Sequence, residues 1–241
     1  IKIEIRPKII QSTKGRGTTH ILRLDIYIET PIYLYEIKSM KIFCIGRGKT
    51  GTTSLEESLK ELGFKVGNQR KGELLIRDYH KNNFQPIIEL AKTADAFQDI
   101  PFSYPNTYKH LDKAYPNSKF ILSIRNSADE WYNSVIRFHS QIFGRGKKPS
   151  VEQLKKSKWV WEGCIYETMQ NLYNTPADDP YNKEILTNHY ISYNQKIIDY
   201  FKDRPNDLLV INLKDENSYL DFSKFLNKKP KRSSFPHLNR S

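Results

Sequence analysis

The sequence predicts an α/β protein with a central parallel sheet and helices on both faces of that sheet. From residue 40 onward, short apolar runs alternate with segments of helical periodicity, which is typical of parallel strands joined by crossover helices. The chain has 241 residues, enough for one such domain with a small appendage. We expect the strands of the sheet at 42–45, 64–66, 94–98, 120–124 and 208–213.

The first 39 residues follow a different pattern. Residues 1–5 and 22–28 alternate apolar and polar side chains with a period of two, as half-buried strands do. Residues 11–20, which include two glycines, would form the turn between these strands. We therefore expect residues 1–39 to be a short β-hairpin extension without a catalytic role. The main domain would be 40–241, beginning at Met40, which is compatible with a natural start codon.

Two helices can be placed beside the predicted strands. The first ends at Gly63, and the second opens at Ser127–Glu130, which has the sequence of a capping box. Their apolar stripes are Leu55, Leu59 and Leu62 in the first helix, and Trp131, Val135 and Phe138 in the second. Segments 69–93 and 139–188 show no clear strand, so we expect helices and loops there.

Composition limits the classes of function. Lys and Arg number 39 and Asp and Glu 27, giving a formal charge of +12, which calls for an anionic partner such as nucleic acid, an acidic surface or a phosphorylated small molecule. No apolar stretch approaches the length of a membrane span, so no membrane partner is expected. Cys44 and Cys164 are far apart, and the six histidines lack ligand spacing, so we expect no metal site and a reducing, cytoplasmic location.

A glycine-rich turn follows the 42–45 strand and leads directly into the first helix. Such a turn offers backbone N–H groups and the positive end of a helix dipole to a phosphate. An empty tight turn is the simpler interpretation, but it does not explain the density of Lys and Thr. The candidate ligand-binding residues are Arg47, Gly48, Lys49, Thr50, Gly51, Thr52, Thr53 and Ser54.

Two common phosphate motifs fit this turn poorly. The spacing of Gly46, Gly48 and Gly51 matches the dinucleotide fingerprint, but the required carboxylate about 20 residues later is missing, and only an NADP-type arginine could replace it. The nucleotide P-loop also fails, because Thr52 stands where its lysine should be. The lysine stands at Lys49 instead.

The run Lys49–Thr53 resembles the 5′-phosphosulfate loop of the sulfotransferase family, whose pattern is Lys-Ser/Thr-Gly-Thr-Thr. The resemblance implies a three-layer P-loop-like fold and the donor 3′-phosphoadenosine-5′-phosphosulfate (PAPS), with adenosine 3′,5′-bisphosphate (PAP) as product. One lysine beside the bridging oxygen can stabilise the departing phosphate, so no metal is required. Lys49 is accordingly the first predicted catalytic residue.

A second segment strengthens this resemblance. Arg125 ends a strand and Ser134 lies in the next helix, as in the 3′-phosphate-binding segment of sulfotransferases. Taken alone, Arg125 is better explained as a surface salt-bridge partner and Ser134 as a tolerated small residue, and the resemblance reverses this preference. The two stand nine residues apart, one more than the commonest family spacing.

The chain also departs from the well-studied cytosolic enzymes. Ser54 replaces their adenine-stacking tryptophan, and their C-terminal Arg-Lys-Gly loop is missing. Lys229, Lys231 and Arg232 could take the place of that loop, or they could form a solvated basic tail.

The position of the catalytic base also follows from the resemblance. The family's usual histidine, in a His-x-Pro context, aligns with Asp99, so Asp99 is the second predicted catalytic residue. Asp99 could instead cap the turn before Pro101, and His139 is a competing base.

Together these features predict a sulfotransferase that moves a sulfonate from PAPS to a hydroxyl or amine by in-line displacement. A P-loop nucleotide-dependent kinase, or a non-catalytic nucleotide- or nucleic-acid-binding relative, remains the alternative. The acceptor would be a small molecule or a glycan, a homodimer is possible, and nucleic acid is not expected, because no recognised nucleic-acid-binding motif occurs.

Overall fold

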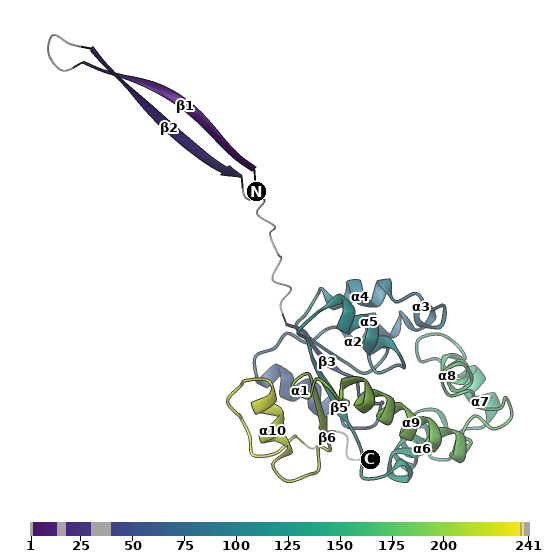
Figure 1. Ribbon diagram of the computed structural model, residues 1–241. Helices are drawn as coiled ribbons and strands as arrows, with labels where there is room; N and C mark the ends of the chain where they lie inside the picture. The colour runs from purple at the N-terminus through teal and green to yellow at the C-terminus, as the bar shows by residue number, and fades with distance from the viewer. Residues whose placement is uncertain (1, 14–17, 30–39, 237, 239–241) are drawn as a thin grey trace. The chain divides into compact units, whose positions relative to one another are not determined.

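The structure is a computed structural model that describes residues 2–13, 18–29, 40–236 and 238, with side chains from residue 40 onward (Figure 1). It divides into two compact units, Ile1–Lys38 and Ser39–Ser241. In the first unit, β1 (Lys2–Thr13) pairs antiparallel with β2 (Thr18–Glu29). Both strands run further than their alternating patterns indicated, so the turn predicted at 11–20 is wrong at both of its ends, and its middle lies outside the described residues.

The second unit is built on a four-stranded parallel sheet, which confirms the predicted fold class. Its strands are β3 (Ile42–Cys44), β4 (Ala96–Gln98), β5 (Lys119–Ser123) and β6 (Leu208–Ile211). Their order in space is β4-β3-β5-β6. Because β3 and β5 are neighbours and all strands are parallel, the segments that follow the four carboxyl ends meet at one edge of the sheet.

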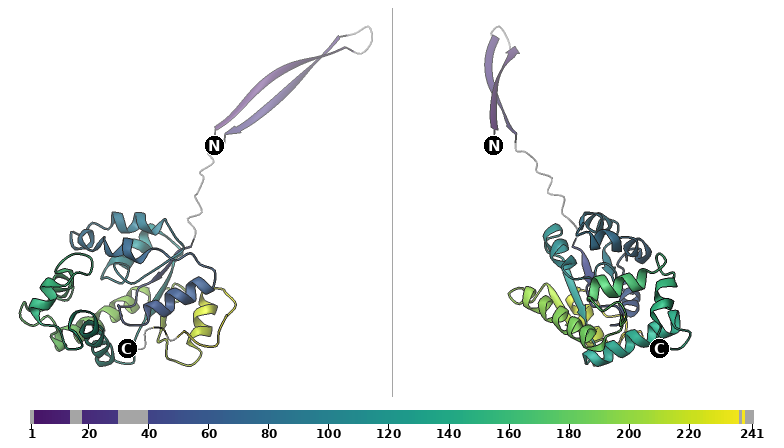
Figure 2. Two further views of the ribbon diagram at one scale, coloured as in Figure 1. Left: turned by 180° about the vertical axis from the view of Figure 1, so that it is seen from behind. Right: turned by 90° about the vertical axis from the view of Figure 1, so that its right-hand side faces the viewer.

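Side chains alternate between the two faces of the sheet, and each face has its own helices. Phe43 and Phe120 pack with α4 (Gln85–Ala91), α5 (Thr107–Ala114) and α9 (Lys183–Phe201). Ile42 and Ile121 pack on the other face with α1 (Thr52–Glu61) and α10 (Ser218–Phe225). Figure 2 shows the sheet between these helices. The core therefore has three layers, and it leaves the carboxyl edge of the sheet to the loops.

One predicted strand does not form. At 64–66 only Val66 makes a single parallel bridge, to Ala96, beside the edge of β4. Gly67 follows, and a Cβ at that position would lie 2.1 Å from the ring of Phe97. The segment is held at the edge of β4 by the hydrogen bonds of this bridge, from the Ala96 N–H to the Lys65 carbonyl at 3.1 Å and from the Gly67 N–H to the Ala96 carbonyl at 2.8 Å, and the pairing does not extend into a strand.

The two predicted helices at the sheet are confirmed. α1 is followed by Gly63, whose φ of +89° favours glycine. α6 (Ala128–Phe143) begins after Ser127, whose hydroxyl accepts the backbone N–H of Glu130 at 3.0 Å. The second half of the predicted capping box is not formed, because the Glu130 carboxylate accepts the N–H of Asn126 instead.

Segments 69–93 and 139–188 are helices and loops, as expected. Besides α4 and the ends of α6 and α9, they contain α2 (Gln69–Glu73), α3 (Ile76–His80), α7 (Val151–Lys156) and α8 (Cys164–Tyr173). No helix in the described part of the chain is both long enough and apolar enough to cross a membrane.

Candidate functional site

The glycine-rich turn lies pressed against neighbouring segments at the carboxyl edge of the sheet. A Cβ on Gly46 would lie 2.1 Å from the hydroxyl oxygen of Ser123 and 2.5 Å from its carbonyl oxygen. Gly51, the N-cap residue of α1, has a φ of +103°, and a Cβ there would meet Leu213 at 2.5 Å. These two glycines are therefore required by close approach and by backbone conformation.

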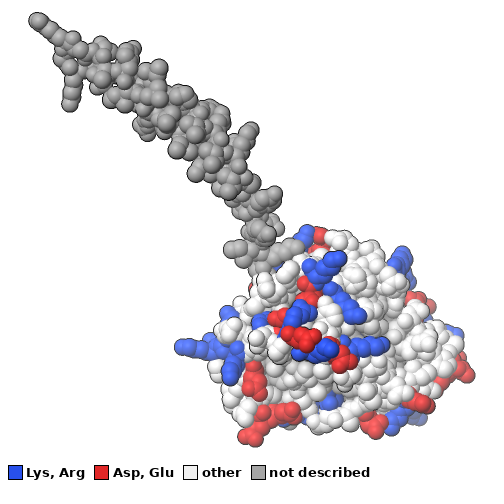
Figure 3. All heavy atoms as spheres, in the orientation of Figure 1, with Lys and Arg blue, Asp and Glu red and all other residues white. Residues whose placement is uncertain are grey.

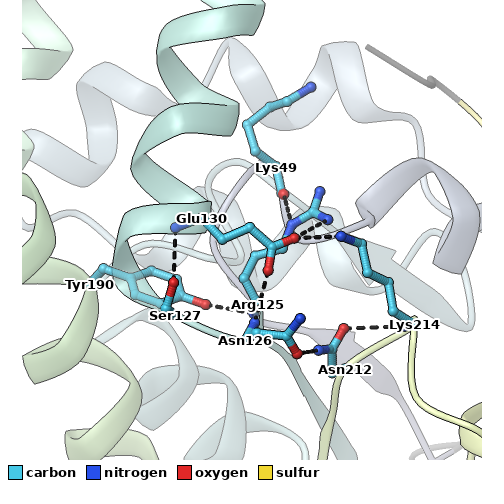
Figure 4. Close-up of polar contacts among 8 residues, drawn as sticks. All are labelled: Lys49, Arg125, Asn126, Ser127, Glu130, Tyr190, Asn212 and Lys214. Carbon is cyan, nitrogen blue, oxygen red and sulfur yellow. Dashed lines mark hydrogen bonds and ion pairs between the residues drawn. The ribbon is translucent and has the colours of Figure 1, made fainter.

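Two side chains from the β5–α6 segment hold successive carbonyls of this turn. The indole N–H of Trp131 donates to the carbonyl of Gly48 at 3.0 Å. Nε of Arg125 donates to the carbonyl of Lys49 at 2.8 Å (Figure 4). Lys49 itself has a φ of +73°, a conformation that a non-glycine residue adopts only when its surroundings enforce it. The two hydrogen bonds supply part of that enforcement.

The Lys49 side chain extends along the surface of α6. Its ammonium nitrogen lies 3.9 Å from the centre of the Phe138 ring. Burial lowers the pKa of Lys49, the charge of Asp99 opposes this change, and the charges of Arg125 and Arg137 reinforce it. Lys49 is thus a half-buried cation in a positive environment, suited to an anionic ligand.

Thr50 and Arg47, two of the predicted ligand-binding residues, pack into the protein beneath the turn. The Thr50 hydroxyl donates to the carbonyl of Arg47 at 2.7 Å and lies 2.6 Å from the Ser123 hydroxyl. The Arg47 guanidinium is buried and donates to the carbonyl of Ser103 at 2.8 Å. It lies 5.0 to 5.5 Å from the ring centres of Tyr104, Tyr173 and Tyr193. These two side chains support the turn from within.

The structure brings Asp99, which follows β4, into contact with the turn after the neighbouring β3. The hydroxyl of Thr52 donates to Oδ2 of Asp99 at 2.9 Å. Burial raises the pKa of Asp99; the Thr52 hydrogen bond lowers it and the nearby Glu73 raises it further. The carboxylate is therefore a stronger proton acceptor than an exposed aspartate would be.

A cavity of about 380 Å³ lies along the turn and includes Lys49 and Asp99 in its lining. Aromatic and aliphatic side chains of α6, α8 and the segment before α8 form its far wall: Phe138, Phe143, Trp159, Ile165, Met169, Leu172 and Tyr173. His139, the competing base, also lines this cavity. Its Nδ1 lies 2.9 Å from the hydroxyl of Tyr181, and burial together with the charge of Lys49 lowers its pKa to about 4.

A second cavity of about 480 Å³ adjoins the first. Its lining includes Arg125 and Ser134, so the structure brings these two predicted residues together. Both cavities share them, along with Gly51, Ser54 and Leu238. The second cavity is completed by Arg137 and Glu130 on α6, Asn212, Leu213 and Lys214 after β6, Thr50 at the turn, and Phe235 and Pro236 near the C-terminus.

Polar contacts link Arg125 to the end of β6, as Figure 4 shows. The Arg125 Nη1 lies 3.4 Å from Oε1 of Glu130, and the Lys214 ammonium lies 2.5 Å from the same oxygen. The backbone N–H of Arg125 donates to the hydroxyl of Tyr190 at 2.9 Å. Sequence reasoning missed Lys214, although a lysine directly after a predicted strand neighbouring the Arg125 strand was a usable signal.

Comparison with protein families matches residues 41–241 to the family model described as a sulfotransferase domain. The chain belongs to the sulfotransferase family. It is therefore a transferase of sulfonate groups, as the loop at Lys49 and the Arg125 segment predicted. Comparison with curated proteins gives no match.

The basic tail of this sulfotransferase does not reach the two cavities. Arg232 forms an ion pair with Glu61 at the end of α1, with Nε of the arginine 2.7 Å from Oε2. Lys229 and Lys231 are exposed, and none of the three cations lines either cavity. This arrangement favours a solvated tail over a substitute for the missing Arg-Lys-Gly loop.

The sulfotransferase domain shows no group of three or more His, Cys, Asp or Glu side chains placed to hold a metal ion, as far as its residues are described. The charged groups of the site are the cations beside the turn and the carboxylates of Glu56, Glu73, Asp99 and Glu130.

Proposed function

We propose that this sulfotransferase uses PAPS as donor and transfers its sulfonate in line to a hydroxyl or amine acceptor. The observation that carries this proposal is the junction of two cavities at one turn. Lys49 and Asp99 line the first cavity, and Arg125 and Ser134 line both. PAPS has phosphates at two positions, and the acceptor must approach the sulfonate from the side opposite the leaving phosphate. Two adjoining cavities, one for the acceptor and one for the 3′-phosphate and adenine, suit this arrangement.

The donor would be held by groups on both sides of the turn. Gly51, the N-cap residue of α1, has no side chain that could accept the backbone N–H groups of the first turn. These N–H groups and the positive end of the helix dipole are thus left to the 5′-phosphate, which would lie beside Thr52, Thr53 and Ser54. Arg125 and Ser134 would bind the 3′-phosphate. Leu213, Phe235 and Pro236 supply apolar surface to the second cavity, where the adenine ring would find contacts that Ser54 cannot provide.

The donor supplies an activated sulfonate, and the protein supplies charge and a base. The Lys49 ammonium would stabilise the negative charge that develops on the phosphate side of the breaking bond. Asp99 would accept the proton of the acceptor, because its raised pKa improves proton transfer near neutral pH. His139 is less suited to this role, since a group with a pKa of about 4 is a weak proton acceptor.

The acceptor would enter the first cavity between Asp99 and the aromatic wall. Trp159 and Phe138 present ring surface there. Such rings can pack against a small apolar molecule or stack on a sugar, so both acceptor classes remain within the proposal.

The alternatives find less support. A kinase loop needs a lysine where this chain has Thr52, and the Thr52 hydroxyl is bonded to Asp99. A nucleic-acid interface needs a continuous basic surface, whereas the face in Figure 3 shows basic side chains among acidic ones.

A panel of ligands tests the donor assignment. We expect PAP to raise the melting temperature of the protein more than ATP, NADPH or single-stranded DNA at equal concentration. Transfer of radiolabelled sulfonate from PAPS to a collection of phenols, alcohols, amines and glycans would then identify the acceptor. Stabilisation by ATP or DNA without stabilisation by PAP would contradict the proposal.

A further inference from the structure

The second cavity contains more positive charge than the family motif requires. Besides Arg125, the side chains of Arg137 and Lys214 line it, and Glu130 is the single acidic side chain among its lining residues. Three cations and one carboxylate leave a formal excess of two positive charges. A phosphate monoester carries between one and a half and two negative charges at neutral pH, so one such group balances the cavity.

The contacts of Glu130 with Lys214 and Arg125 are weak enough for an anionic ligand to replace them. The Lys214 side chain is 54% exposed and that of Glu130 is 28% exposed, so water competes for their ion pair and its contribution to stability is small. The contact of Glu130 with Arg125, at 3.4 Å, is longer than an ordinary hydrogen bond. If an anion took both cations, Glu130 would keep the N–H of Asn126, which it accepts at 3.2 Å.

The backbone that carries Lys214 is fixed more firmly than its side chain. Asn212 is buried and donates from Nδ2 to Oδ1 of Asn126 at 2.5 Å, which links the end of β6 to the end of β5. The Asn212 Oδ1 accepts the backbone N–H of Lys214 at 3.1 Å. An exposed ammonium is thus carried by a positioned turn near Arg125, as Figure 4 shows.

We propose that Lys214, together with Arg137, binds the 3′-phosphate of the donor beside Arg125, and that Glu130 is the internal counterion which this phosphate replaces. This inference rests on the proposed function, because it assumes a 3′-phosphorylated nucleotide. In this proposal Lys214, in the turn after β6, replaces the cation that the missing C-terminal Arg-Lys-Gly loop would otherwise supply.

The test compares two ligands that differ only in the 3′-phosphate, PAP and 5′-AMP, by isothermal titration calorimetry on the full chain. Lys214→Met keeps the length of the side chain and removes its charge. We expect it to weaken PAP binding about tenfold and to leave 5′-AMP binding unchanged. Glu130→Gln should bind PAP at least as tightly as the wild type, because the competing carboxylate is gone.

Lys183→Met is the matched control. Lys183 is 57% exposed and pairs at 2.7 Å with Asp129, which lies in the same first turn of α6 as Glu130, but Lys183 lines neither cavity. Its loss should change neither affinity. The inference is refuted if Lys214→Met binds PAP as the wild type does, or weakens both ligands equally, or if Glu130→Gln loses PAP binding. A wild type that does not prefer PAP to 5′-AMP refutes the donor assignment itself, and the phosphate site with it.

Discussion

Replacing Thr52 by valine should shift the pH dependence of the transfer reaction. Valine has the shape of threonine without its hydroxyl, so the hydrogen bond to Oδ2 of Asp99, 2.9 Å long in the wild type, is lost. That bond lowers the pKa of Asp99 and opposes the effect of burial. A base acts only when deprotonated, so activity should fall as the pH drops through the raised pKa of this carboxyl, and the fall should begin at higher pH in the variant.

The size of this effect follows from the energy of the lost bond. A hydrogen bond to a charged group contributes about 1.5–3 kcal/mol. Since about 1.4 kcal/mol corresponds to one pH unit, the acidic limb of the profile should move upward by about one to two units. The assay is kcat as a function of pH at saturating donor, which separates the effect on the base from any loss of donor affinity.

Three control variants make this prediction sharp. Thr53→Val removes a hydroxyl from the same turn and should leave the limb in place, whereas Asp99→Asn should remove most of the activity at every pH. His139→Ala should retain activity. An unchanged limb in Thr52→Val, or a dead His139→Ala beside an active Asp99→Asn, would show that Asp99 is not the base.

Three further outcomes are expected. Lys49→Ala should keep the melting temperature and lower kcat about 10²–10³-fold, measured at saturating PAPS; wild-type turnover would contradict its role. Arg125→Ala should weaken PAP binding roughly ten- to a hundredfold and barely change 5′-AMP binding in calorimetry, while equal losses would place its effect on the fold or the adenine. Gly46→Ala should destabilise the protein by about 1–3 kcal/mol in urea denaturation, because its Cβ would overlap Ser123; an unchanged midpoint would show that the turn can move away.

Much of this site could be predicted because its parts follow strand ends. The sulfotransferase resemblance named Lys49, Asp99 and Arg125, and each of them follows a predicted strand or its end. Because segments after neighbouring parallel strands converge, the strand order β4-β3-β5 brings the three together. Ser134 could be added because its distance along the helix after β5 was fixed by a recognisable helix start at Ser127.

What could not be predicted depends on side chains meeting across the fold. The bond between Thr52 and Asp99 joins residues 47 positions apart, and the contact between Lys214 and Glu130 joins residues 84 apart. Neither has a local pattern. The strand predicted at 64–66 was wrong for the opposite reason. Its apolar pattern is local, but a strand also needs a partner, and here only Val66 forms a bridge with β4, at Ala96.

The buried side chain of Arg47 supports the glycine-rich turn that carries Lys49. Sequence reasoning placed it among the donor-binding residues, and that assignment remains a prediction. In the structure its guanidinium meets one carbonyl and three tyrosine rings, and one of these tyrosines, Tyr193, also donates to the carbonyl of Ile45 at 2.6 Å. Hydrogen bonds therefore fix the turn at four successive places: the carbonyl of Ile45, the side chain of Arg47, and the carbonyls of Gly48 and Lys49. Since a left-handed Lys49 persists only where its neighbours are fixed, this buried cation helps to hold the turn in the conformation on which the role proposed for Lys49 depends.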